Sequence, residues 1–166
     1  PEDPEMYEDV QTRYTYAHSN LNKSPEVRLK KMWRSSRDSA RTPVQWSAEE
    51  NAGFTTGKPW FYVNENYVDV NVADQEQDEN SVLNFYRKAI ALRKELSCVR
   101  HGSFTEFNKA SASLFTYARE DATQKILVVC SYTEKEVPFQ APKGFGVASA
   151  QLILHNYGAA GSTMKP

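Results

Sequence analysis

Apolar residues recur at helical spacing in several stretches of the chain. In residues 4–19 these positions are Met6, Val10, Tyr14 and Ala17, and their spacing predicts a helix. A second helix is predicted to begin at residues 24–26, Ser-Pro-Glu. Serine caps a helix well, proline is tolerated at the first helical position, and an acid suits the positive end. That helix must end before Pro43, which cannot continue it.

The longest periodic stretch predicts a helix over residues 81–96, beginning at Asn80 or Ser81 after an acidic run. Its main apolar positions are Val82, Phe85, Tyr86, Ala89, Ile90 and Leu96. Basic residues concentrate in its second half, where they complement the negative helix end. Each large apolar side chain contributes roughly 1.5–3 kcal/mol when buried, so this helix is expected to pack on a large surface.

The remaining pattern is loop-rich in the middle of the chain and β-rich at its end. Two short extended stretches are predicted, at residues 60–63 and 68–72. Beyond Gly102, short β-type runs alternate with turn signals, which predicts an antiparallel sheet or sandwich. The runs are SFTEFN (103–108), SLFTYARE (113–120), KILVVCSYT (125–133), EVPFQ (136–140) and AQLILHN (150–156).

Composition and charge narrow the class of protein. The 166 residues are 40% hydrophobic and 25% charged, with a net charge of −1, which indicates a soluble globular protein. Such a charge gives no overall attraction to nucleic acid or anionic membrane, and no apolar run is long enough to span a bilayer. The basic residues around Trp33 could bind nucleic acid, but a solvated helix face accounts for them. We therefore expect neither a nucleic acid nor a membrane partner.

Cysteine and histidine give no sign of a metal or cofactor. Cys98 and Cys130 both lie in apolar surroundings, so we predict two buried thiols and a reducing, cytoplasmic location. The three histidines, His18, His101 and His155, share no metal-ligand spacing. We expect no cofactor and no metal.

The candidate chemistry lies in residues 37–46, RDSARTPVQW. The rigid, planar guanidinium of Arg41 suits a grip on a carboxylate or on neighbouring hydroxyl groups. Pro43 restricts the backbone just beyond it. Alternatively, Arg37 and Arg41 form ordinary salt bridges, for example with Asp38, that hold the loop in shape. The residues alone leave both interpretations open.

Three stretches carry a resemblance to a known family: SRDSARTPVQW, NAGFTTGKPW and NSVLNFYRKAIALRKE. In this order they resemble the C-terminal part of the α-amylase family of glycoside hydrolases, closest to oligo-1,6-glucosidases, dextran glucosidases and α-glucosidases. LILHNY near the end also fits. The first stretch usually reads SRDNARTPMQW there. This chain departs at Ser39 and Val44, and at Ser47 just beyond, and the departures touch neither arginine.

The resemblance implies an α+β fold in two parts. Residues 1–97 would be the end of a (β/α)8 barrel, comprising a long loop and the last barrel helix. Residues 98–166 would be an antiparallel β-sandwich domain, truncated before its last strand. A whole barrel needs about 250 residues, so we expect a fragment.

The resemblance also implies a function. The parent would be a retaining α-glucosidase, an oligo-1,6-glucosidase or glucan 1,6-α-glucosidase, that hydrolyses terminal α-linked glucose from oligosaccharides. Arg41 matches the arginine that pairs with an aspartate of an early barrel loop and binds that glucose, while Arg37 and Asp38 shape the loop. The catalytic carboxylates lie upstream in the family, so no catalytic residue is expected here and the fragment should be inactive.

The partners we expect are an α-linked gluco-oligosaccharide and the remainder of the barrel. We also expect self-association of the fragment through the helix at 81–96.

Other interpretations of the function stay open. Linkage preference depends on a residue beside the missing nucleophile, so α-1,4-glucosidases, sucrose isomerases and trehalose synthases fit too. From other classes, the chain could belong to a non-catalytic relative, such as the heavy subunit of an amino-acid transporter, or be a sugar-binding or structural β-sandwich module.

Overall fold

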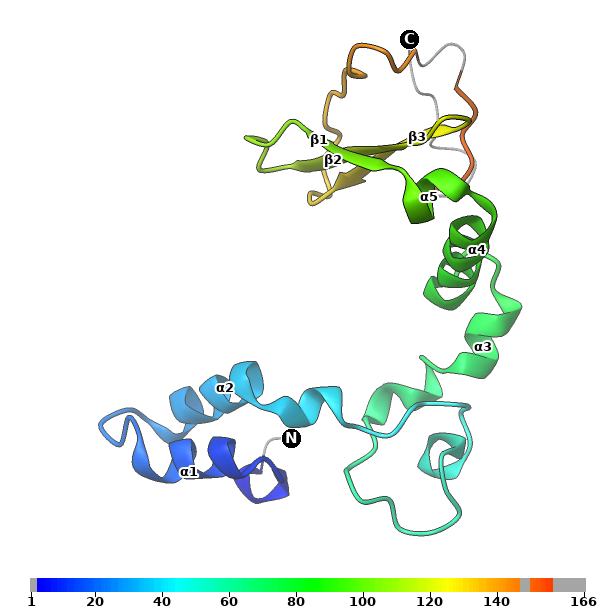
Figure 1. Ribbon diagram of the computed structural model, residues 1–166. Helices are drawn as coiled ribbons and strands as arrows, with labels where there is room; N and C mark the ends of the chain where they lie inside the picture. Colours follow the sequence, from blue (N-terminus) through cyan, green and yellow to red (C-terminus); the bar gives the residue numbers. More distant parts are fainter. Residues whose placement is uncertain (1–2, 147–149, 157–166) are drawn as a thin grey trace. The chain divides into compact units, whose positions relative to one another are not determined.

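The computed structural model describes residues 3–146 and 150–156, and the chain divides into two compact units, Pro1–Asp78 and Glu79–Pro166 (Figure 1). The first unit contains the α-helices α1 (Val10–His18), α2 (Pro25–Ser35) and α3 (Val72–Gln77), and the 3-10 turns η1 (Pro4–Met6), η2 (Arg37–Ala40), η3 (Glu50–Gly53) and η4 (Glu65–Val68). The second contains α4 (Val82–Glu95), α5 (Ser97–His101), β1 (Ser103–Phe107), β2 (Leu114–Glu120) and β3 (Lys125–Ser131).

In the first unit, α1 and α2 pack side by side (Figure 1). The predicted start of α2 is confirmed, since the Ser24 hydroxyl accepts a hydrogen bond from the N–H of Val27 at 3.5 Å and Pro25 is the first helical residue. The helix ends at Ser35, before the loop at residues 37–46. Met32 is buried, with 3% of its surface exposed.

The predicted helix over residues 4–19 is wrong in its first half. The structure has the short turn η1, then extended backbone around Tyr7, and α1 begins only at Val10. The cause is a competing acceptor, because the backbone N–H groups of Glu8 and Asp9 donate to a side-chain carboxylate of Asp38. Bonded there, they cannot belong to a continuous helix.

The predicted extended stretches at residues 60–63 and 68–72 are also wrong. The first is irregular, and the second is divided between η4 and α3. Asn71 explains the second error, since its buried side chain accepts from the N–H of Asp74 at 3.0 Å and caps α3. A side-chain cap of this kind starts a helix where the apolar valines favoured a strand.

The second unit begins with the predicted helix, now α4, which Ser81 caps by accepting from the N–H of Asn84 at 3.1 Å. The short α5 that follows was not predicted. Three antiparallel strands then form a sheet in the order β1-β2-β3, with Thr105 opposite Ala118 and Ala118 opposite Leu127. Contacts of α5 with β2 and β3 bury Cys98 and Ala118, with 0% and 3% exposed.

The predicted β-sandwich is not confirmed. Three of the five predicted strands form, but residues 136–140 and 150–156 are irregular, so the described residues contain one sheet and no second layer. Pro138 accounts for part of this, because it has no N–H to donate to a ladder. The prediction that both thiols are buried holds for Cys98 and is wrong for Cys130, which is exposed on the outer strand β3.

Along the sequence, the boundary between the two compact units falls between Asp78 and Glu79. The resemblance instead predicts a domain boundary at residue 97. Helix α4 thus groups with the sheet in this chain. The compact units are defined by contacts within this chain alone, whereas the boundary at residue 97 refers to the domains of a complete protein. The domain boundary stays a prediction.

A polar cluster joins the start of α5 to the hairpin between β2 and β3. The carboxylate of Asp121 accepts from the Ser97 hydroxyl and, at 2.8 Å each, from the N–H groups of Thr123 and Gln124. These bonds hold the pKa of Asp121 well below its usual range. Close packing continues at Gly102, where a Cβ would lie 2.5 Å from the carbonyl oxygen of Cys98. The junction therefore admits no side chain at residue 102.

We predict that Asp121→Ala lowers the melting temperature of the chain at neutral pH. Because the folded carboxyl has a depressed pKa, it binds a proton less readily than in the unfolded chain. Its stabilisation is therefore present above the unfolded pKa of about 3.9 and is lost as pH falls through the folded pKa. Thermal unfolding from neutral pH into the acid range should show the difference from wild type shrinking as pH falls. Glu134→Gln, at an exposed position, is the control, and a gap independent of pH would contradict the prediction.

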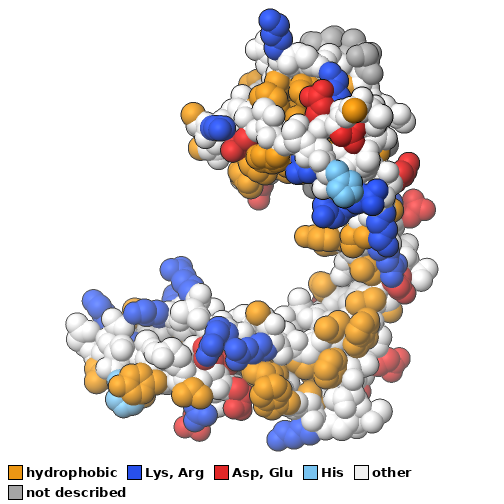
Figure 2. Space-filling model, in the orientation of Figure 1, with side chains coloured by type: hydrophobic (Ala, Val, Ile, Leu, Met, Phe, Trp, Pro, Cys, Tyr) orange, Lys and Arg blue, Asp and Glu red, His pale blue; other side chains and the backbone are white. Residues whose placement is uncertain are grey.

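One face of α4 presents large apolar side chains to solvent (Figure 2). Val82, Tyr86 and Ile90, at four-residue spacing, are 68%, 62% and 51% exposed. None of the helix residues is buried. This exposure is unusual for a periodic stripe, which normally packs on a core.

We predict that the isolated chain self-associates through this stripe. Sedimentation velocity over a range of concentrations should show the wild-type chain forming larger species. Replacing Val82, Tyr86 and Ile90 by glutamine should shift it toward monomer, since the apolar area that drives association is removed. A monomeric wild-type chain at all concentrations would show that the stripe does not mediate association.

Candidate functional site

The residues of the RDSARTPVQW stretch form a closed turn followed by an irregular loop. Ser36, directly after α2, accepts from the N–H of Asp38 at 3.2 Å and starts η2. The N–H of Arg41 then donates to the carbonyl oxygen of Asp38 at 2.9 Å. Pro43 is buried just beyond. The backbone that carries Arg41 is therefore fixed on both sides.

The carboxylate of Asp38 is fully buried, with 0% of the residue exposed. Its Oδ2 atom accepts from the N–H of Glu8 at 2.7 Å and from that of Asp9 at 3.0 Å, while Oδ1 has no partner among the described residues. Burial, and then the nearby negative charge of Asp38, raise the pKa of the Tyr62 phenol. A charge buried in this way fixes the turn to the chain segment that leads into α1.

Arg37 pairs with Asp9, not with Asp38. Its Nη2 lies 2.6 Å from Oδ1 of Asp9, and its N–H donates to Oδ2 at 3.4 Å. Thr12 adds a hydroxyl donor to Oδ2 at 2.6 Å. The hydrogen bond from Arg37 is the main reason that the pKa of Asp9 lies well below its usual range, and Asp9 in turn raises the pKa of Arg37. The salt bridge suggested between Arg37 and Asp38 does not form, and the actual partner, Asp9, lies 28 residues away in sequence.

Arg41 is exposed, and its guanidinium has no hydrogen bond or ion pair with any residue in the part of the chain that the structure describes. The far end of the loop is held separately. The N–H groups of Val72 and Ala73 donate to the carbonyl oxygens of Gln45 and Trp46 at 2.9 and 3.0 Å. The arrangement presents a free cation on a backbone that is anchored before and after it.

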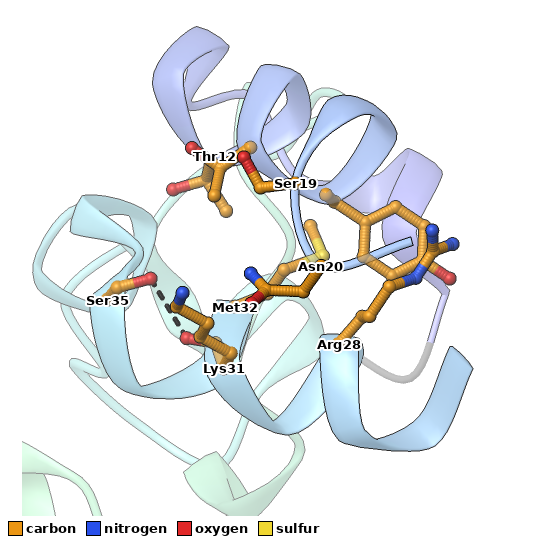
Figure 3. Close-up of a pocket in the computed structure, with 9 residues that line it drawn as sticks. Thr12, Ser19, Asn20, Arg28, Lys31, Met32 and Ser35 are labelled. Atoms are coloured by element: carbon orange, nitrogen blue, oxygen red, sulfur yellow. Dashed lines mark hydrogen bonds between the residues drawn. The ribbon is translucent and has the colours of Figure 1, made fainter. Parts of the chain in front are cut away.

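Two hollows in the first unit are alternative candidate sites. A cavity of about 10 Å³ lies between α1 and α2 (Figure 3), about the room that one water molecule needs. Arg28 lies at its edge, 4.4 Å above the ring of Tyr16. An open depression elsewhere is lined by Glu49, Glu50, Gly53, Phe54, Thr55 and Thr56. The first is too small for a sugar, and neither includes Arg41.

Residues 3–146 and 150–156 contain no group of three or more potential metal ligands. In the same ranges, no helix is long and apolar enough to cross a membrane. The structure brings Arg37 and Asp38 together with Asp9, and only the side chain of Arg41 stays outside these contacts.

Comparisons with known proteins agree on one family. Residues 6–102 match the family model described as alpha amylase, catalytic domain. The chain is 41% identical over 155 residues to the probable oligo-1,6-glucosidase 2 of Bacillus subtilis (strain 168), a match that covers 92% of this chain and 28% of that protein.

Solved structures give the same picture. The trehalose-6-phosphate hydrolase of Bacillus licheniformis is similar with a TM-score of 0.86 and 31% identity, over 100% of this chain and 30% of that one. The trehalulose synthase of Pseudomonas mesoacidophila MX-45 is similar with a TM-score of 0.79 and 34% identity, over 85% and 26%. The chain therefore spans less than a third of the length of the relatives it matches.

We predict that Asp38→Ala lowers the free energy of unfolding by about 1–3 kcal/mol, because two backbone N–H groups lose their buried acceptor. Asp38→Asn should lose less, since its amide oxygen can still accept and its NH2 group would take the place of an oxygen without a partner. Urea unfolding measures both. Lys30→Ala, at an exposed position on α2, is the control, and an Asp38→Ala variant as stable as wild type would show that these N–H groups find another acceptor.

Proposed function

This chain belongs to the alpha-amylase family, and we propose that the complete protein is a retaining α-glucosidase that releases terminal α-linked glucose from short oligosaccharides, with α-1,6 bonds as its main target. The observation that carries this proposal is the 41% identity to a probable oligo-1,6-glucosidase across 92% of the chain. The catalytic pair of carboxylates, which a retaining enzyme holds about 5–5.5 Å apart, would come from the remainder of the protein.

In this proposal Arg41 binds hydroxyl groups of the terminal glucose. A guanidinium offers several N–H donors in a fixed plane, which suits the oriented binding of a neutral sugar. Two features support the assignment. Its side chain is exposed and has no partner among the described residues, and its backbone is held by Asp38 and Pro43. A carboxylate from elsewhere in the protein would pair with it at the floor of the pocket.

A second candidate function is hydrolysis of trehalose 6-phosphate. It is favoured by the similarity to the Bacillus licheniformis enzyme, which covers 100% of this chain. The two candidates share the cleavage of an α-glucosidic bond and differ in the group on the far side of it. A phosphate there would need cations outside the glucose pocket, whereas an isomaltose unit would not.

The substrate assay separates these candidates. The complete protein is expected to release glucose from isomaltose with a kcat/KM at least about tenfold higher than for trehalose 6-phosphate, a difference of about 1.4 kcal/mol in transition-state binding. The 166-residue chain alone is expected to release none from either. Preference for trehalose 6-phosphate would select the second candidate, and absence of hydrolysis by the complete protein would contradict both.

We predict that Arg41→Ala in the complete enzyme lowers kcat/KM by at least about 2–3 kcal/mol, since a charged partner is left unpaired in the pocket and the glucose loses its donors. Steady-state kinetics with isomaltose measure this. Arg34→Ala, which removes an exposed arginine from the last turn of α2, is the control. Wild-type kinetics in the Arg41 variant would assign that arginine to loop structure instead.

A further inference from the structure

We propose that Asp9 is a positioning residue for the Arg41 guanidinium, acting through Arg37 and Asp38. The inference rests on the proposed function, in which Arg41 binds the terminal glucose. Asp9 lies outside every stretch that carried the resemblance, and only the structure brings it to the arginine loop.

The first step is that the carboxylate of Asp9 bonds the arginine loop and does not cap the backbone N–H groups of its own helix. Asp9 directly precedes α1, where an aspartate normally accepts from the first N–H groups of the helix. Here its side chain makes no such bond. It is 97% buried, since 3% is exposed, and its oxygens accept from Arg37 at 2.6 and 3.4 Å and from the Thr12 hydroxyl at 2.6 Å.

The second step is that Asp9 holds two consecutive residues of the η2 turn. Its side chain holds Arg37, and its main-chain N–H donates to Asp38 at 3.0 Å. The N–H of Glu8 adds a second bond to the same oxygen of Asp38 at 2.7 Å. Fixed at two adjacent residues, the turn can neither slide along α1 nor rotate about a single contact.

The third step carries this constraint to Arg41. Its N–H donates to the carbonyl oxygen of Asp38 at 2.9 Å, so a displacement of Asp38 moves the backbone of Arg41 with it. The Arg41 side chain has no other partner among the described residues. Among the described residues, the turn therefore places the backbone from which the guanidinium extends, and Asp9 holds the turn.

Placement matters because a sugar is bound through the geometry of its donors. A displacement of about 1 Å in a group that orients a substrate can lower the rate by about 100-fold. Asp9→Asn keeps the size of the side chain but removes its negative charge, so the ion pair with Arg37 becomes a weaker hydrogen bond from the guanidinium to a neutral amide oxygen. The turn should then loosen while α1 and α2 remain folded.

The test is a double-mutant cycle in the complete enzyme with isomaltose as substrate. Asp9→Asn is expected to raise KM and to lower kcat/KM by about 10- to 100-fold. When Arg41 is already alanine, Asp9→Asn should change kcat/KM by less than about twofold, because the group it positions is gone. Asp69→Asn makes the same chemical change at an exposed aspartate of the same unit and should leave the kinetics unchanged.

Each other outcome has a defined meaning. Losses that multiply in the double variant, or wild-type kinetics in Asp9→Asn beside an impaired Arg41→Ala, overturn this inference and leave the proposed function standing. Wild-type kinetics in Arg41→Ala overturn this inference and the assignment of Arg41 to the glucose pocket, whereas the proposed hydrolysis itself is overturned only if the complete protein releases no glucose. If Asp9→Asn does not fold, Arg37→Gln replaces it in the cycle. That side chain is 64% exposed, so the change is tolerable, and the same non-additivity with Arg41→Ala is expected.

Discussion

A single oxygen of the buried Asp38 carboxylate accepts two backbone hydrogen bonds, and the first unit is arranged around this contact. It joins the turn after α2 to the segment before α1, which are about thirty residues apart in sequence. Two N–H donors are a strong arrangement for a carboxylate, since charged acceptors form shorter and stronger bonds than neutral ones. The same contact delays the start of one predicted helix to Val10 and fixes the backbone of Arg41.

Features encoded within a few residues could be predicted from the sequence. Ser24 and Ser81 cap their helices because a serine oxygen reaches an N–H three residues ahead. The three hairpin strands follow from alternating side chains between turn signals. The error at α3 is of the same kind, since Asn71 is an ordinary capping residue whose signal was outweighed by the valines around it.

Features that depend on distant partners could not be predicted. The pair between Arg37 and Asp9 spans 28 residues, and no spacing rule relates two residues at that distance on different elements. The prediction that Cys130 is buried is wrong for a similar reason. Cys130 lies in an apolar run typical of a buried strand, but whether a thiol is covered depends on what packs on the outer strand of the sheet. The proposed role of Arg41 comes from the resemblance, whereas the contacts that hold its loop could be found only in the structure.

The different states of the two arginines follow from how the nearby acids are used. Asp9 and Asp38 are both buried carboxylates near the loop, and a buried charge requires a partner or hydrogen bonds. Arg37 pairs with Asp9, and backbone N–H groups bond Asp38. Asp9 is therefore already paired with Arg37, and the carboxylate of Asp38 is buried while the side chain of Arg41 is exposed. The free guanidinium is thus a product of the anchoring network, which stabilises the loop and at the same time keeps a cation available for a partner outside it.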